Sequence, residues 1–204
     1  MRFAAVVLAG GRAVRLDGAD KASIEYDGRS LLEHAIEALL DADEVVVVGE
    51  PVPTTRPVTF CRESPRYGGP VAALLTGYDA LLSRPTTVGV LAVDMPWVTP
   101  WTFRRLHEAA AGRDGAFLTD ADGRRQLAGV LEAARLTRAR PDLEAQHGMP
   151  MHRLLSGLDL AEVGPEGDEG RDVDSWADLR DLQPGPTASL GGCEGAAVDG
   201  NLGP

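Results

Sequence analysis

Runs of apolar residues alternate with segments of helical periodicity through the first half of the chain. The runs are short and bounded by turn residues, as expected of strands that are buried on both faces. They cover residues 3–8, 44–49, 58–61 and 86–93. The segments 31–40 and 71–82 have apolar faces that we expect to extend to Leu40 and Leu82. Strands and helices in this order predict a parallel sheet that is covered by helices on both sides.

Short polar signals indicate where the helices begin. Ser30, followed three residues later by Glu33, has the pattern of a capping box. Thr99 and Pro100 open a later helix, because proline is well tolerated at the first helical position. A short strand over residues 22–26 is expected before the first of these helices.

The second half of the chain has a less regular pattern. Residues 115–119 and 126–132 are predicted to form paired strands around a turn at Asp122. The further elements expected are short helices at 133–140 and 150–155, a strand at 158–163 and a last helix at 172–182.

The composition changes from Gln183 onward to glycine, proline, alanine and serine. Such a segment has too little apolar surface to fold alone, so we expect it to be disordered. The predicted fold class is therefore α/β, with a single three-layer α/β/α domain over residues 1–182 and a tail over residues 183–204. Its Rossmann-like sheet is expected to be mostly parallel, with an antiparallel hairpin portion.

The overall charge narrows the range of partners. A formal net charge of −11 over 204 residues argues against nucleic acid or an anionic membrane as a partner. No segment approaches the ~18 consecutive apolar residues of a membrane span, and the N-terminus lacks the order of a signal peptide, so we expect a cytoplasmic location. Cys61 and Cys193 suggest neither a disulfide framework nor a metal clip, and the four histidines lack zinc-site spacing.

Candidate chemistry begins directly after the first strand. The double glycine Gly10-Gly11 can turn sharply and bring backbone N–H groups close to a ligand. Two arginines follow, of which the second is Arg15, and then Lys21, the only lysine of the chain. Lysine acts on phosphate as a mobile point charge. A strand, a glycine turn and clustered cations predict a place for a polyphosphate, although the sequence is neither a P-loop nor a dinucleotide fingerprint.

Three carboxylates follow predicted strands or extended segments. Ligands of open α/β sheets bind beyond the carboxyl ends of the strands, so Asp94, Glu63 and Asp174 are candidates for the same site. A carboxylate that faces a cationic glycine loop would suit Mg²⁺ held between protein and phosphate. For Asp94 we favour this role. For Glu63 and Asp174, a helix cap or a solvated surface acid is an equally good interpretation.

Four segments together resemble a known family. Residues 8–21 are similar to the L-A-G-G-x-x-x-R-M-G-x-D-K signature of the molybdenum cofactor guanylyltransferases, within the nucleotidyltransferase group that includes sugar-phosphate pyrophosphorylases. Residues 69–74 resemble the family's G-P-L-A-G, 93–96 its V-D-M-P and 173–179 its V-N-T-P-E-D-L. The resemblance covers about residues 3–182 in the family's order, and it implies the fold of the nucleotide-diphospho-sugar transferases.

The resemblance also implies roles for individual residues. Those expected to contact the guanine nucleotide through backbone are Leu8, Ala9 and Gly10. Those expected to hold the triphosphate are Gly11, Arg15 and Lys21. Gly49 and Glu63 are further positions near the nucleotide, and the metal ligands are Asp94 and, at the family's asparagine, Asp174. Catalysis is expected to depend on Arg15, Lys21 and Asp94.

The implied reaction is Mg²⁺-dependent transfer of GMP from GTP to the phosphate of molybdopterin, with release of pyrophosphate. That phosphate monoester has a second pKa of ~6, so it is already an anionic nucleophile near neutral pH and needs no general base. Molybdoenzymes or cofactor-biosynthesis proteins are possible transient partners. Asp17, Gly49 and Asp174 depart from the family's residues. Cytidylyl transfer, an acceptor such as a sugar phosphate or phospholactate, and an inactive nucleotide-binding module remain alternatives.

Overall fold

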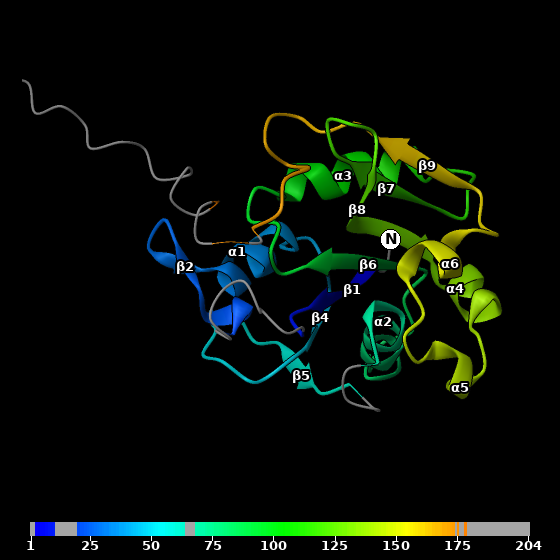
Figure 1. The fold of residues 1–204 in the computed structure, drawn as a ribbon, viewed down its shortest axis with the longest axis horizontal. Helices are drawn as coiled ribbons and strands as arrows, with labels where there is room; N and C mark the ends of the chain where they lie inside the picture. The colour runs from blue at the N-terminus through cyan, green and yellow to red at the C-terminus, as the bar shows by residue number, and fades with distance from the viewer. Residues whose placement is uncertain (1–2, 11–19, 64–67, 174, 176–177, 179–204) are drawn as a thin grey trace, which may run out of the picture.

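The computed structural model describes residues 3–10, 20–63, 68–173, 175 and 178. Seven strands form one sheet in the order β5-β4-β1-β6-β8-β7-β9 (Figure 1). Their bounds are β1 (Phe3–Leu8), β4 (Glu44–Val48), β5 (Thr59–Cys61), β6 (Thr87–Ala92), β7 (Gly115–Thr119), β8 (Arg125–Glu132) and β9 (Leu160–Val163). The strand β8 runs antiparallel to both of its neighbours, and every other pairing is parallel. The predicted parallel sheet with an antiparallel hairpin is therefore confirmed.

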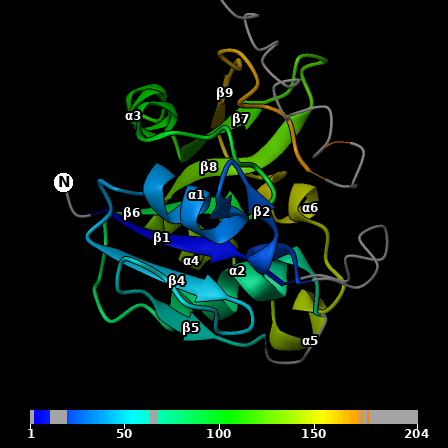
Figure 2. The same ribbon diagram turned by 90° about the vertical axis from the view of Figure 1, so that its left-hand side faces the viewer.

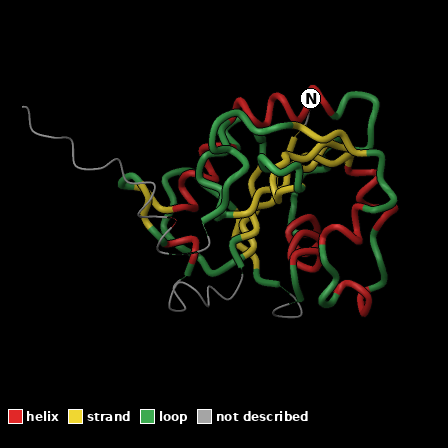
Figure 3. Tube along the Cα trace, turned by 45° about the horizontal axis from the view of Figure 1, so that its top comes forward, coloured by secondary structure: helices red, strands yellow, loops and turns green. Residues whose placement is uncertain are grey.

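Helices cover both faces of this sheet (Figures 2 and 3). Their bounds are α1 (Leu31–Ala38), α2 (Pro70–Asp79), α3 (Pro100–Ala109), α4 (Ala133–Ala139), α5 (Leu143–Gln146) and α6 (Met151–Leu155). Alternate residues of β1 point to opposite faces, so Val7 packs with α1 and α3 whereas Val6 packs with α2, α4 and α6. All six residues of β1 are buried, which explains why this strand has a continuous apolar sequence. The three-layer α/β/α arrangement is confirmed.

Two helix starts follow the polar signals of the sequence. The Thr99 hydroxyl accepts from the Thr102 backbone N–H, and the Thr102 hydroxyl accepts from the Thr99 N–H in return. At α1 the Ser30 hydroxyl accepts from the Glu33 N–H at 3.2 Å. The Glu33 carboxylate, however, accepts from the N–H and hydroxyl of Thr55, both at 2.7 Å. Only the first half of the predicted Ser30–Glu33 capping box is therefore formed.

Two predicted helices end earlier than their apolar patterns suggested. The helix α1 ends at Ala38, and Leu40 is 61% exposed rather than part of the core. The helix α2 ends at Asp79, and Leu82 is 90% exposed. Its backbone N–H donates to the Glu44 carboxylate at 2.7 Å instead of continuing the helix. In both cases the leucine fits the spacing of the helix's apolar face in the sequence, but the helix ends before it.

Smaller corrections concern short elements. In place of a strand over residues 22–26, the chain forms a 3-10 turn, Lys21–Ser23, and then the small hairpin of β2 (Glu25–Tyr26) and β3 (Arg29–Ser30). The helix α5 had no sequence signal that we recognised. Most of the predicted helix 172–182 and the whole tail 183–204 lie outside the described residues. Within the described part of the chain, no helix is both long enough and apolar enough to span a membrane.

Candidate functional site

The last residues of four parallel strands lie in one row. Leu8 of β1 is in register with Val48 of β4 and with Ala92 of β6, and Val48 is in register with Cys61 of β5. The chain therefore leaves all four strands at the same edge of the sheet, where open α/β folds bind ligands. The predicted site residues that this edge brings together are Leu8, Ala9, Gly10, Gly49, Glu63 and Asp94.

Backbone hydrogen bonds continue this row beyond the strands. The Ala9 N–H donates to the Val48 carbonyl at 3.0 Å, and the Gly49 N–H donates to the Cys61 carbonyl at 2.9 Å. A Cβ atom at Gly49 would lie 3.0 Å from the Cβ of Ala9. Glycine at position 49 therefore allows the segments that follow β1 and β4 to approach closely where they leave the sheet.

The carboxylate of Glu63 lies against Gly10. A Cβ atom at Gly10 would lie 3.3 Å from Oε1 of Glu63, and the other oxygen of that carboxylate accepts from the Gly68 N–H at 3.1 Å. Gly10 is exposed, so its backbone remains accessible beside an acceptor group. Gly10, after β1, and Glu63, after β5, are thus neighbours at this edge of the sheet.

A lysine and an aspartate that are 73 positions apart in sequence meet at this edge. The Lys21 ammonium donates to Oδ2 of Asp94 at 2.8 Å, and the two side chains are 18% and 21% exposed. Lys21 is held by the 3-10 turn, which Asp20 caps by accepting from the Ala22 N–H at 3.3 Å. Asp94 lies two residues after Ala92, the last residue of β6, and precedes Met95, which is 2% exposed and anchors the turn in the core. The two charges are therefore fixed from both sides.

A third segment reaches the same place from the C-terminal half. The Val173 N–H donates to the backbone carbonyl of Asp94 at 2.8 Å, and Val173 is fully buried. The end of this segment therefore lies against Asp94. The predicted site residues Gly11, Arg15 and Asp174 are outside the described residues, as is Asp17.

The donor chemistry of this site fits magnesium. Asp94 supplies hard carboxylate oxygens, and Oδ1 has no hydrogen-bond partner among the described residues. No group of three metal-ligating side chains occurs in the described part of the chain. Mg²⁺ is usually held by one or two carboxylates together with substrate phosphates and water, so a single protein carboxylate suffices to begin its shell. Burial raises the pKa of the nearby Cys61 thiol, which argues against a thiolate ligand or nucleophile here.

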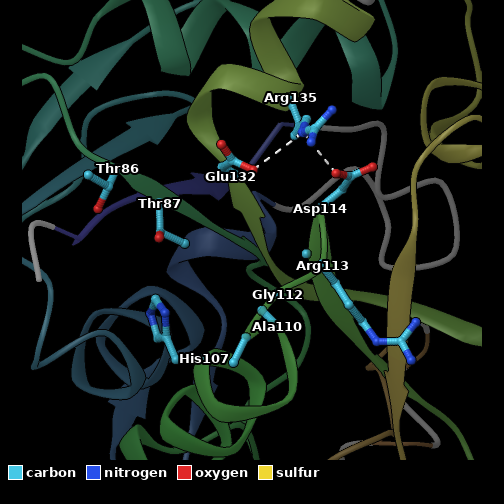
Figure 4. Close-up of a pocket in the computed structure, with 11 residues that line it drawn as sticks. Thr86, Thr87, His107, Ala110, Gly112, Arg113, Asp114, Glu132 and Arg135 are labelled. Atoms are coloured by element: carbon cyan, nitrogen blue, oxygen red, sulfur yellow. Dashed lines mark hydrogen bonds and ion pairs between the residues drawn. The ribbon is translucent and has the colours of Figure 1, made fainter.

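A pocket of about 420 Å³ lies at the opposite edge of the sheet (Figure 4). It is lined by Thr87 at the start of β6, by His107 of α3 and by the ion pair of Arg135 with Asp114 at 2.9 Å. Burial lowers the pKa of His107, against an opposing effect of the Asp41 charge. None of the predicted site residues lines this pocket, so its volume alone does not mark the site of chemistry.

A second pocket, of about 400 Å³, lies at the carboxyl ends of β7 and β9. Its lining includes Asp120, Gln126, Arg171 and Asp172, of which Asp172 directly precedes the Val173 that binds Asp94. None of these residues was predicted from the sequence to belong to the site. The rule that selected Asp94 could have found Asp120, because Asp120 directly follows β7.

Comparison with known proteins agrees with this geometry. The model of the MobA-like NTP transferase domain matches residues 5–162. A curated relative, the probable molybdenum cofactor guanylyltransferase of Methanosarcina acetivorans, is 34% identical over 125 residues. That match covers 55% of this chain and 55% of the relative, so the chain spans about half the length of the curated relative.

Solved structures share the fold at lower identity. A nucleotidyl transferase from Methanothermobacter thermautotroptrophicus has a TM-score of 0.71 and 22% identity, covering 89% of this chain and 95% of that one. The molybdopterin-guanine dinucleotide biosynthesis protein A of Archaeoglobus fulgidus has a TM-score of 0.64 and 19% identity, covering 88% and 96%. These likenesses establish the α/β fold, independently of any particular substrate.

Proposed function

Because the chain belongs to the MobA-like NTP transferase domain family, we propose that it transfers GMP from GTP to the phosphate of molybdopterin. The products are the guanine dinucleotide cofactor and pyrophosphate. The observation that carries this proposal is the meeting of Lys21 and Asp94 at the carboxyl edge of the sheet, where β1 and β6 end in register. The guanylyltransferase relatives support the choice of GTP and molybdopterin.

In this proposal the nucleotide lies across the ends of β1 and β4. Leu8, Ala9 and Gly10 contact it through backbone, and Gly49 leaves space beside Ala9. The Glu63 carboxylate, which lies next to Gly10, can accept hydrogen bonds from the N–H groups of the guanine edge. Gly11 and Arg15 belong to the same loop after β1 and are assigned to the triphosphate by the family pattern.

Lys21 and Asp94 are proposed to act on the triphosphate. Without nucleotide they neutralise each other, since their charged atoms are 2.8 Å apart. An arriving triphosphate is a competing anion, so the flexible Lys21 ammonium can transfer its hydrogen bonds to phosphate oxygens. This frees the Asp94 carboxylate for a cation, with Asp174 as the proposed second ligand. Bound Mg²⁺ supplies charge neutralisation at the phosphates as a Lewis acid.

The residues of the site need only position and stabilise the reacting groups. The acceptor phosphate is anionic near neutral pH, because its second pKa is ~6. It therefore attacks the α-phosphorus without a general base, the bond to pyrophosphate breaks, and Lys21 stabilises the charge on the departing group. The reaction is proposed to take place in the cytoplasm.

The nucleotide preference tests this proposal without requiring the acceptor. GTP with Mg²⁺ should raise the melting temperature of the protein more than CTP, ATP or UTP at equal concentration, because binding to the native state stabilises it by mass action. The control is the same series with EDTA, in which the GTP effect should shrink. A larger shift with CTP would support cytidylyl transfer, and equal shifts with all four nucleotides would contradict a guanine-specific site.

A further inference from the structure

The connection that follows β9, residues 164–173, is held tightly against the sheet. We refer to it as the strap; it is the orange segment that leaves β9 in Figure 1. A Cβ atom at Gly170 would lie 2.8 Å from the Thr119 carbonyl oxygen and 2.9 Å from the Cα of Asp120. At its end, Val173 donates to the Asp94 carbonyl at 2.8 Å. The strap therefore packs on the end of β7 and then joins the candidate site.

A buried carboxylate fixes the middle of the strap to α3. Glu169 is only 5% exposed. Its Oε1 accepts from the hydroxyl of Thr102, and its Oε2 accepts from the Arg105 guanidinium. The same Oε2 accepts from the backbone N–H of Glu166 at 2.9 Å. Two elements far apart in sequence are thus joined by one carboxylate with three donors.

The cluster of Glu169, Thr102 and Arg105 attaches the strap to α3 through buried charges. Removing a carboxylate and a guanidinium from water is unfavourable, and the pair must offset this by good geometry. Arg105 is 15% exposed in its side chain, and its buried Nε has no hydrogen-bond partner among the described residues. An apolar contact would hold the strap without these costs. The buried Glu169–Arg105 pair fixes the strap on α3 in one position, because each charge has its partners in only that arrangement.

Only a few residues of the strap separate Glu169 from the candidate site at Asp94. Four residues along the chain from Glu169 lies Val173, whose backbone N–H binds the carbonyl of Asp94. We propose that Glu169, held by Thr102 and Arg105, is a positioning residue that sets how Val173 meets Asp94. The inference rests on the proposed function, because the metal-bound triphosphate at Asp94 is what this contact serves. The anchor should govern metal use, whereas nucleotide contacts belong to the loops after β1, β4 and β5.

The test uses Glu169→Gln with Glu166→Gln as the matched control. The amide of Glu169→Gln keeps the size of the side chain but is uncharged, so its hydrogen bond from the Arg105 guanidinium loses the attraction between opposite charges. Glu166 belongs to the same strap and also pairs with Arg105, at 3.3 Å, but its side chain is 60% exposed. Should Glu169→Gln fail to fold, Arg105→Lys takes its place, because it keeps the charge and loses the planar fork.

Hydrogen exchange reports on the strap independently of any reaction. In Glu169→Gln the amides of residues 170–173 should exchange about tenfold faster than in the wild type, whereas β1 is unchanged. Glu166→Gln should match the wild type in both regions. Unchanged exchange in residues 170–173 of a folded Glu169→Gln protein would overturn the anchor.

Metal dependence reports on positioning. Glu169→Gln should raise the Mg²⁺ concentration for half-maximal activity by about tenfold, with the KM for GTP at saturating Mg²⁺ within about twofold of the wild type. Binding of Mn²⁺, followed by electron paramagnetic resonance, should weaken in parallel. Faster exchange with unchanged Mg²⁺ dependence and unchanged Mn²⁺ binding would show that the anchor is structural only, and would overturn the positioning role.

The proposed function can fail separately. A wild-type protein that transfers no nucleotide would contradict the proposed function. Mn²⁺ binding would then test whether Glu169 positions the metal site. Weaker Mn²⁺ binding in Glu169→Gln than in Glu166→Gln would support it, and equal binding in the two variants would overturn it.

Discussion

In the proposed function, the Lys21–Asp94 pair prepares the site for a charged ligand. The pair is largely buried, and the cost of removing two charges from water offsets much of their attraction, so it is weak evidence for a structural role. Its position at the carboxyl edge, where β1 and β6 end in register, explains it better. Each residue protects the other from being left as an unpaired, largely desolvated charge until a triphosphate and its cation replace both partners.

His107 carries a prediction of pH dependence. Its ring packs edge-on against Phe3 with centroids 4.5 Å apart, and burial lowers its pKa despite the Asp41 charge. The unfolded chain therefore binds a proton more readily than the folded one. Stability from the neutral ring is fully present above the unfolded pKa of about 6.5 and is lost as the pH falls through the lower folded pKa.

The measurement is thermal unfolding at pH 7.5 and pH 5.5. The wild type should lose more of its melting temperature between these pH values than His107→Gln, which has no proton to bind at this position. An equal loss in the two proteins would mean that His107 titrates normally in the folded state.

Residue-scale prediction from sequence succeeded where a side chain follows a strand. Asp94 and Glu63 could be placed at one edge because the carboxyl ends of parallel strands meet there. The partner of Glu169 could not be predicted, because Thr102 and Arg105 come from a helix 64 or more positions away in sequence. Sequence periodicity carries no record of which loop will fold back onto which helix.

At the scale of elements, close packing of α2 on the sheet depends on one glycine. A Cβ atom at Gly77 would lie 2.4 Å from Cγ1 of Val6 and 2.8 Å from Cγ2 of Val48. The helix can therefore approach β1 and β4 only where it lacks a side chain.

Gly77→Ala should destabilise the protein despite the better helix propensity of alanine. Propensity favours alanine by ~1 kcal/mol, but overpacking of a core typically costs ~1–3 kcal/mol, and both clashing groups are buried valines. We expect a net loss of about 1–2 kcal/mol in the free energy of unfolding by urea. Gly157→Ala is the control, because a Cβ there meets nothing within 4 Å. A Gly77→Ala protein as stable as that control would contradict the packing argument.

Element boundaries were predicted less well than element types. The apolar spacing of α1 and α2 continues to Leu40 and Leu82, yet both helices stop earlier and expose these leucines. Hydrophobic spacing indicates which face is buried, but a helix ends where its last carbonyls find other partners. Neither end has a glycine that would have marked it in the sequence.

At the scale of the whole molecule, charge and topology favour the same edge. The chain has a net charge of −11, so an anionic substrate is repelled by most of the molecule and requires local cations. The only lysine of the sequence lies at the carboxyl edge, where four parallel strands end in one row. The parallel core and its helices were predictable from the alternating pattern, and the strap's path from β9 to Asp94 was not, because it depends on long-range contacts.

Product identification tests the central claim most directly. The protein is incubated with GTP, Mg²⁺ and molybdopterin, and the mixture is analysed by mass spectrometry and a pyrophosphate assay. We predict the guanine dinucleotide and pyrophosphate in equal amounts. Lys21→Ala and Asp94→Ala should reduce the rate by about 10²–10³-fold, whereas the exposed controls Arg84→Ala and Asp142→Ala should retain it. No dinucleotide from the wild type, or undiminished turnover by both site variants, would contradict the account.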